Sequence, residues 1–395
     1  MNKTKFDRKT KEDRPVLAIC YDFDKTLSPD NMQAQGYIQA IEFGEADFWQ
    51  ESNTLAEEND MDQNLAYMYM MVQGARGKVI FNRNNLMAYG AKVKLFPGVE
   101  EWFDRINSYG EQRGVIVEHY IISSGLKEMI EGTEIAKKGA FEKIYASSFY
   151  YDKDGVAVWP AQVINYTSKT QFLFRIEKGI LDINDPGVND FFPPEHLRVP
   201  FRNMVYIGDS DTDIPCMKLV NTYGGHSIGV YNPEQDDRHK VYRLLADNRI
   251  KYFAPANYTE GSELDGLVKA IIDRTEMNER LETFHSQQKE EMGKAQKIDK
   301  RDEADRKKDD LIDDLLESPN FTYTLQTIHD LKQYKDWHPR QKEKLFHALL
   351  NNKQISKLGG ATEVKAFYDA LLEDEDQLSE QAKAVEIILR QLKKK

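Results

Sequence analysis

The feature that most constrains the fold is an apolar run at residues 16–21, Val-Leu-Ala-Ile-Cys-Tyr, which two aspartates follow. Such a run is typical of a strand buried on both faces inside a parallel sheet. Asp22 and Asp24 then stand where this strand ends, which is the edge where open α/β sheets bind ligands. A turn in which Thr26 caps a helix is the alternative interpretation of the same residues.

The spacing of the two aspartates indicates what they can do. In extended backbone, side chains two positions apart point the same way, so the carboxylates of Asp22 and Asp24 are expected side by side. Two neighbouring carboxylates repel each other unless a cation or a proton lies between them. Mg²⁺ is the expected cation because it prefers hard oxygen ligands and takes few protein groups.

Two later apolar segments predict further buried strands with polar ends. Residues 115–122 lead into Ser123 and Ser124, and a helix is expected over residues 126–138. A serine at such a turn suits an oxyanion, although a plain helix cap fits as well. Residues 204–207 lead into Gly208 and Asp209, with Asp213 four positions further on. A solvated acidic loop is the alternative there.

Lys169 opens a predicted helix over residues 171–178. A cation in the first turn of a helix opposes the helix dipole, so this position favours an anionic partner such as phosphate. A solvated lysine is the simpler alternative. Lys178, at the other end of the same helix, competes for the same role.

Composition limits the class of protein. With 395 residues the chain predicts two or three domains. A formal net charge of −12 makes nucleic acid an unlikely partner. Cys20 and Cys216 are too few and too far apart for a disulfide framework. Because no signal segment or membrane span is expected, the predicted location is cytoplasmic.

Apolar spacing and charge divide the chain into four predicted parts. An α/β core takes residues 15–30 and 93–273, and a helical cap is inserted at residues 31–92. The residues from 274 to 318 are rich in charge and predict a helical linker, and residues 319–395 predict a small helical C-terminal module. The module is a candidate for binding a protein partner or a second copy of the chain.

In order, the chain carries Asp22-x-Asp24-x-Thr26, then Ser123, Lys169, and Gly208-Asp209 with Asp213. This order resembles the haloacid dehalogenase (HAD) superfamily, specifically phosphatases of the phosphoserine phosphatase-like branch, and the resemblance covers residues 15–273. It implies a Rossmann-like, doubly wound parallel sheet with a helical cap. The C-terminal module lies outside the resemblance.

The resemblance also implies roles for the matching residues. It makes Asp22 the nucleophile that forms an aspartyl-phosphate and Asp24 the general acid and base. It implies that Mg²⁺ is held by Asp22, Asp209 and the backbone carbonyl of Asp24, while Asp213 acts through metal-bound water. Ser123 and Lys169 would hold the phosphate, with a backbone N–H from Ser124. The implied activity is Mg²⁺-dependent hydrolysis of a small phosphomonoester.

Several points stay open at this level. A phosphotransferase or phosphomutase would use the same aspartyl-phosphate, and the domain could instead serve a protein assembly through its C-terminal helices. Lys25 stands where the family often has a small residue, and Asp211 adds an acid beside the expected metal site. Four cap residues are candidates for contacting the substrate: Tyr67, Arg76, Lys78 and Arg83.

Overall fold

The computed structural model describes residues 6–209, 211–235, 237–296, 303–373 and 379–392. The chain forms two compact units, one up to His285 and one from Ser286 onward. Each has a hydrophobic core of its own. None of the described helices is both long enough and apolar enough to cross a membrane.

The first unit is built on a seven-stranded sheet in the order β4-β3-β2-β1-β5-β6-β7. The central strand, β1 (Val16–Tyr21), is buried along its whole length and pairs in parallel with β2 (Ile116–Leu126) and β5 (Met204–Gly208). The outer parallel strands are β3 (Lys143–Tyr151), β6 (His226–Tyr231) and β7 (Tyr252–Pro255). Only β4 (Ala157–Gln162) runs antiparallel among the described strands. The doubly wound α/β fold expected from the sequence is confirmed.

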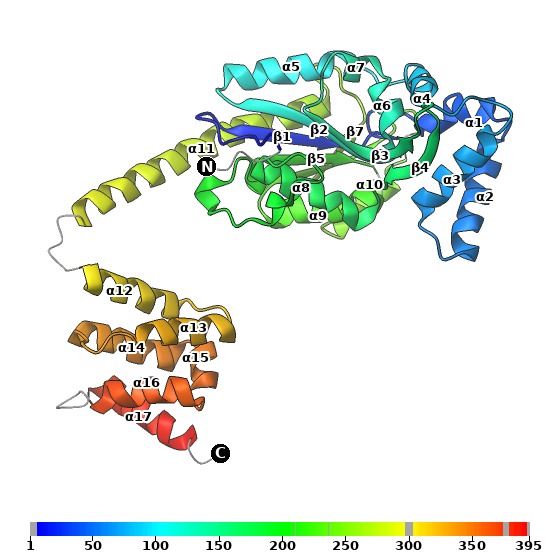
Figure 1. Cartoon of the computed structure of the whole chain (residues 1–395). Coiled ribbons are helices and arrows are strands. Elements are labelled where there is room, and N and C mark those ends of the chain that lie inside the picture. The colour runs from blue at the N-terminus through cyan, green and yellow to red at the C-terminus, as the bar shows by residue number, and fades with distance from the viewer. Residues whose placement is uncertain (1–5, 210, 236, 297–302, 374–378, 393–395) are drawn as a thin grey trace. The chain divides into compact units, whose positions relative to one another are not determined.

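Helices cover both faces of this sheet, as Figure 1 shows for α5 and α8. The side chains of β1 alternate between the two cores, so Leu17 and Ile19 face one and Ala18 and Cys20 the other. One face is covered by α5 (Val99–Gln112) and the first turns of α11 (Glu263–Gln296). The other is covered by α8 (Thr170–Lys178), α9 (Ile214–Thr222) and α10 (His239–Ala246).

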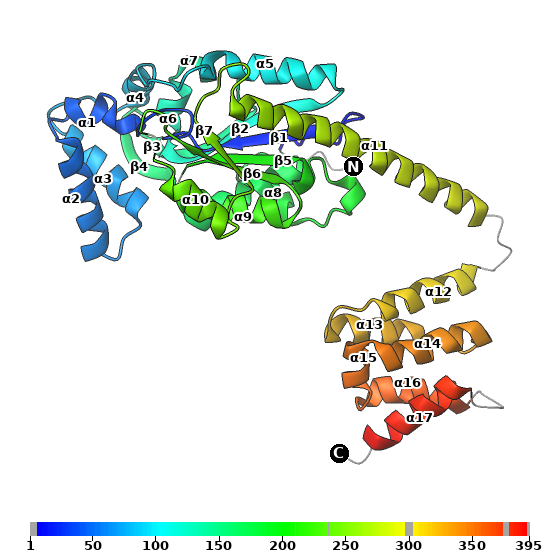
Figure 2. The same ribbon diagram turned by 180° about the vertical axis from the view of Figure 1, so that it is seen from behind.

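The residues between β1 and α5 form a group of helices at one end of the sheet, beyond β3 and β4 (Figure 2). They are the short 3-10 helix η1 (Met32–Ala34), α1 (Tyr37–Ala40), α2 (Glu45–Glu58), α3 (Gln63–Ala75) and α4 (Arg83–Gly90). Tyr67, Met68 and Met71 of α3 are buried. These helices occupy the stretch predicted to form the cap.

One predicted helix is wrong. Instead of a helix over residues 126–138, β2 continues to Leu126, and two short helices follow, α6 (Lys127–Glu131) and α7 (Glu134–Lys137). The break falls at Gly132, where an added Cβ would lie 2.0 Å from the carbonyl oxygen of Met87 in α4. Close packing of α4 against α6 therefore decides the local structure. Strand β7 has no counterpart among the predicted elements.

The second unit contains α12 (Glu303–Leu316), α13 (Phe321–Leu331), α14 (Pro339–Asn351), α15 (Lys353–Leu358), α16 (Thr362–Glu373) and α17 (Glu380–Leu392). Its core includes Ile312 and Leu315 of α12. The predicted linker over residues 274–318 therefore needs correction, because its last part belongs to the module. The reason is that α12 buries a narrow apolar stripe although most of its residues are charged. Residues 297–302, within the predicted linker, lie outside the described part.

Candidate active site

The sheet brings the predicted motifs to one place. Asp22 follows β1, Asp209 follows β5, and Ser123 lies near the end of β2. The strand order reverses at β1, and crevices at such a switch point are where doubly wound sheets bind ligands. A cavity of about 280 Å³ is found here, lined by Asp22, Asp24, Ser123, Ser124 and Asp209 among others.

Three of the aspartates form a tight cluster. Asp22, Asp209 and Asp213 each place a carboxylate oxygen within 4.8 Å of the other two. Asp213 is fully buried because the backbone of Gly208 leaves space for its carboxylate: a Cβ on Gly208 would lie 2.5 Å from Asp213 Oδ2. The hydroxyl of Tyr206 in β5 donates a hydrogen bond to Asp213 Oδ1 at 2.9 Å.

Lys169 lies inside this acidic cluster. It ends the 3-10 helix η2 (Tyr166–Lys169), directly before α8, and its side chain is fully buried. Its Nζ is 2.7 Å from Asp213 Oδ1 and 3.3 Å from Asp22 Oδ1. Lys178 lies elsewhere, since its Nζ donates to the carbonyl oxygens of Val188 and Asp190, each at 2.7 Å. The lysine beside Asp22 is therefore Lys169.

Burial and mutual repulsion shift the acids strongly. Burial, followed by the nearby charge of Asp213, raises the pKa of Asp22 to about 6, with a hydrogen bond from Ser123 among the smaller opposing effects. The same two causes, together with Asp22, raise the pKa of Asp209 to about 7. Burial alone would lower the pKa of Lys169, but Asp213 and Asp22 outweigh it and the pKa is raised. The cluster thus carries more negative charge than one lysine neutralises.

These residues fit a divalent cation. Asp22 Oδ1 is buried and accepts no hydrogen bond from any described residue. Three carboxylates with oxygens this close are a donor set suited to Mg²⁺, which binds hard oxygen ligands. Asp213 belongs to the same cluster, so it lies near enough for the role through metal-bound water that the resemblance implies.

Asp24 lies beside this cluster and not within it. Its Oδ1 accepts a hydrogen bond from the backbone N–H of Met32 at 2.8 Å, and its side chain lines the cavity. Burial, followed by the charge of Asp22, raises the pKa of Asp24 well above its ordinary value. A carboxyl group whose pKa is raised in this way is suited to donate a proton.

The two serines differ in their surroundings. Ser123 is buried, and its Oγ accepts a hydrogen bond from the backbone N–H of Gly125 at 3.1 Å. Because β2 continues past it, Ser123 caps no helix, which removes the simpler interpretation of this residue. The backbone carbonyl of Ser124 accepts hydrogen bonds from the hydroxyls of Tyr67, at 2.8 Å, and Ser147, at 3.1 Å.

Lys25 and Asp211 are also placed by the structure. Lys25 is exposed, lines the cavity and has a φ of +57°. That backbone conformation favours glycine, which gives a physical reason for a small residue at this position. Asp211 points away from the cluster: its side chain is 62% exposed and lies 3.8 Å from Arg243 Nη2.

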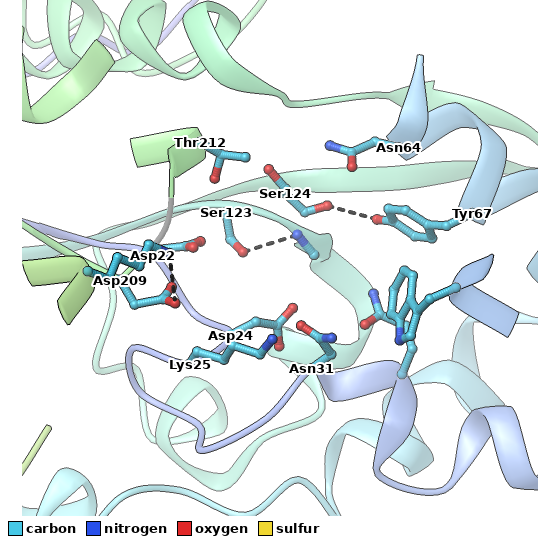
Figure 3. Close-up of a pocket in the computed structure, with 14 residues that line it drawn as sticks. Asp22, Asp24, Lys25, Asn31, Asn64, Tyr67, Ser123, Ser124, Asp209 and Thr212 are labelled. Carbon is cyan, nitrogen blue, oxygen red and sulfur yellow. Dashed lines mark hydrogen bonds and ion pairs between the residues drawn. The ribbon is translucent and has the colours of Figure 1, made fainter. Parts of the chain in front are cut away.

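The helices at residues 31–92 supply the rest of the cavity wall. Figure 3 shows Asp22 and Asp209 on one side of the cavity and Asn64 and Tyr67 on the other. Of the four candidates for contacting the substrate, Tyr67 lines the cavity. Arg83 and Lys78 are not among the lining residues: Arg83 pairs with Glu131, and Lys78 Nζ lies 3.2 Å from Glu42 Oε2. Arg76 is not among the lining residues. Five other lining residues could not be recognised from the sequence: Asn31, Gln33, Trp49, Asn64 and Lys240. Thr212, which also lines the cavity, could have been found because it lies inside the Gly-Asp motif.

Comparisons with known proteins find one related sequence and solved structures of similar fold. No family model matches the chain. An uncharacterized protein of Borreliella burgdorferi is 28% identical over 272 residues, which is 63% of this chain and 94% of that protein. Two solved structures resemble the fold.

The first is a HAD family hydrolase from Salmonella enterica serovar Typhi, at 15% identity and a TM-score of 0.44, covering 66% of this chain and 73% of that one. The second is a phosphoserine phosphohydrolase-like protein from Francisella tularensis, at 18% identity and a TM-score of 0.37, covering 60% of this chain and 94% of that one. These likenesses concern the fold, and any chemistry has to be argued from the cavity residues.

Proposed function

We propose that this chain is a Mg²⁺-dependent phosphomonoester hydrolase of the HAD superfamily. The observation that carries the proposal is the meeting of Asp22, Asp209 and Asp213, from distant parts of the sequence, within 4.8 Å of one another. Lys169 lies 3.3 Å from Asp22 in the same cluster, and Asp24 and Ser123 line the same cavity. Phosphoryl transfer depends mainly on positioning and on neutralising charge, and this arrangement offers both.

In the proposed reaction a carboxylate oxygen of Asp22 attacks phosphorus. An O–P bond forms to Asp22, the P–O bond to the alcohol breaks, and Asp24 gives its proton to the leaving oxygen. Asp24, now ionised, takes a proton from water, whose oxygen attacks the phosphorus of the aspartyl-phosphate. Inorganic phosphate leaves, and both aspartates return to their starting forms.

The remaining residues of the cluster bind the phosphoryl oxygens or position the groups that do so. In this proposal the Nζ of Lys169, beside Asp22, and the hydroxyl of Ser123, in the cavity wall, bind the oxygens of the transferred phosphoryl group. Asp213 positions Lys169 by accepting a hydrogen bond from its Nζ, and Tyr206 positions Asp213 by donating a hydrogen bond to the same carboxylate. Mg²⁺ at Asp22, Asp209 and Asp213, with the Asp24 carbonyl implied by the resemblance, would offset the repulsion between carboxylate and phosphate.

The test is hydrolysis of p-nitrophenyl phosphate by the full chain with and without Mg²⁺. We expect activity that requires the metal, is abolished in Asp22→Asn and is kept in Asp211→Asn, whose exposed side chain lies outside the cluster. Full activity in Asp22→Asn would show that the nucleophile is wrongly assigned.

A dehalogenase also uses an aspartate nucleophile, but it has no alkoxide to protonate. Halide release from 2-chloropropionate, measured with the same preparations, distinguishes the two reactions. We expect none, because Asp24 is placed as a proton donor.

A further inference from the structure

Three polar atoms in the cavity wall have no partner. Gln33 Oε1, Trp49 Nε1 and Ser124 Oγ are buried and make no hydrogen bond with any described residue. All three residues line the cavity. Gln33 is only 2% exposed. A buried polar atom without a partner costs about 1–3 kcal/mol, and hydrogen bonds from a molecule in the cavity would remove this cost.

The wall on this side is uncharged. The lining residues contributed by residues 31–92 are amides and aromatic rings, namely Asn31, Gln33, Trp49, Asn64 and Tyr67. The two lining cations, Lys25 and Lys240, come from outside residues 31–92, and Lys240 Nζ lies 4.0 Å from Asp209 Oδ2. Among the described residues, the helical side of the cavity therefore offers hydrogen bonds and ring surface but no ion pair.

Contacts hold the ring of Trp49 and the backbone next to the other two groups in place. The ring of Trp49 packs edge-on against Phe48, at 5.3 Å between centroids, and against Tyr67, at 5.9 Å. The hydroxyl of Tyr67 is tied to the carbonyl of Ser124. Gln33 follows Met32, whose N–H is bound by Asp24. Such fixed groups discriminate between ligands because they cannot turn away from a poor match.

We propose that the alcohol released from the substrate is uncharged and hydroxyl-bearing, so that the substrate class is a sugar or polyol phosphate and not the phosphate of an amino acid or hydroxy acid. The proposal rests on the phosphohydrolase function above. Hydroxyl groups both donate and accept, which matches an unpartnered amide oxygen, an indole N–H and a serine hydroxyl. A carboxylate or ammonium placed there would be buried without an opposite charge, which is costly.

A matched pair of substrates tests this directly. Glycerol 3-phosphate and 3-phosphoglycerate differ only in a hydroxymethyl group against a carboxylate. We expect kcat/KM with Mg²⁺ to be at least about tenfold higher for glycerol 3-phosphate, equivalent to about 1.4 kcal/mol. Glucose 6-phosphate and O-phosphoserine extend the comparison to larger and zwitterionic alcohols, and we expect the same order.

Two substitutions test whether the cavity wall at residues 31–92 causes the preference for an uncharged alcohol. Trp49→Phe keeps a ring and removes the N–H, and Gln33→Leu removes the amide. Each should lower the ratio of kcat/KM for glycerol 3-phosphate to that for p-nitrophenyl phosphate by about three- to tenfold. Gln50→Leu, at an exposed position next to Trp49, is the matched control and should leave the ratio unchanged.

The outcomes separate the two proposals. Equal or higher kcat/KM for 3-phosphoglycerate, no turnover of either three-carbon ester, or unchanged ratios in both cavity variants would overturn the substrate class. In each case Asp22-dependent hydrolysis of p-nitrophenyl phosphate would leave the phosphatase assignment standing. If hydrolysis of p-nitrophenyl phosphate did not depend on Asp22, the proposed function itself would be overturned.

Discussion

The crowding of the aspartates makes a specific prediction about stability and pH. In the metal-free protein, burial and the charges of Asp213 and Asp22 raise the pKa of Asp209 to about 7, against an ordinary value of 3.8. At any pH between these two pKa values, Asp209 holds a proton in the folded protein that it has lost in the unfolded chain. The free energy of unfolding must therefore fall as pH rises through this window.

The size of the effect follows from the two pKa values. A single group titrating at about 7 when folded and 3.8 when unfolded loses about 2 kcal/mol of stability between pH 5.5 and pH 8. For a unit of this size, each kcal/mol shifts the melting temperature by about 2 °C or more, so the drop is roughly 4 °C.

The assay is thermal unfolding in EDTA at the two pH values, followed by tryptophan fluorescence. Trp337→Phe serves as the background, because the other three tryptophans, Trp49, Trp102 and Trp159, all lie in the first unit. We expect Asp209→Asn to reduce the drop by the contribution of this one group, about 2 kcal/mol, since an amide does not titrate. Asp211→Asn, on the same loop but exposed, should keep the full drop.

Magnesium provides a second arm of this experiment. A cation at the cluster replaces the proton, so saturating Mg²⁺ should abolish the drop in the parent protein and raise its melting temperature more at pH 8 than at pH 5.5. Equal pH dependence in Asp209→Asn and Asp211→Asn would refute the claim that repulsion within this cluster limits stability.

Three further predictions concern other contacts. Lys169→Met should lower the free energy of unfolding by about 3 kcal/mol or more and abolish phosphatase activity, because the acids lose their buried cation. Lys178→Met, which removes a lysine away from the cluster, should keep the activity. Urea titration measures the stability, and turnover of p-nitrophenyl phosphate measures the activity. Gly132→Ala should cost about 2–4 kcal/mol in thermal unfolding, since its Cβ would lie 2.0 Å from Met87 O, while Gly266→Ala in α11 meets no atom within 4 Å and should be neutral or stabilising. Burial alone would raise the pKa of Glu118, but hydrogen bonds from Arg198, Lys9 and Tyr120 outweigh it and lower the pKa to about 2 from 4.5. The ionised side chain therefore contributes about 3 kcal/mol of stability above pH 4.5, and this contribution should be lost as the pH falls toward 2. An acid titration of Glu118→Gln should show a smaller loss.

The sequence by itself determined the central strands of the sheet and the motif order. An apolar run has to be buried, and a pair of carboxylates needs a cation, a proton or a cavity beside it, so the strand over residues 16–21 and the position of Asp22 at its end follow from local chemistry. The same reasoning located the strands that precede Ser123 and Asp209. Lys169 was recognisable because its charge is misplaced at a helix start, and the structure explains why, since two carboxylates surround it.

Only the tertiary structure decided the helical side of the cavity and the limits of several elements. Gln33 and Trp49 carry no local signal, because an amide and an indole are ordinary on a helix until packing buries them against a cavity. The choice between Lys169 and Lys178 depended on which end of α8 approaches β1. Gly132 ended a predicted helix through contact with α4, and α12 joined the module by burying a few apolar side chains. Local sequence fixes which groups must avoid burial or seek it, whereas packing between distant segments decides which of them meet.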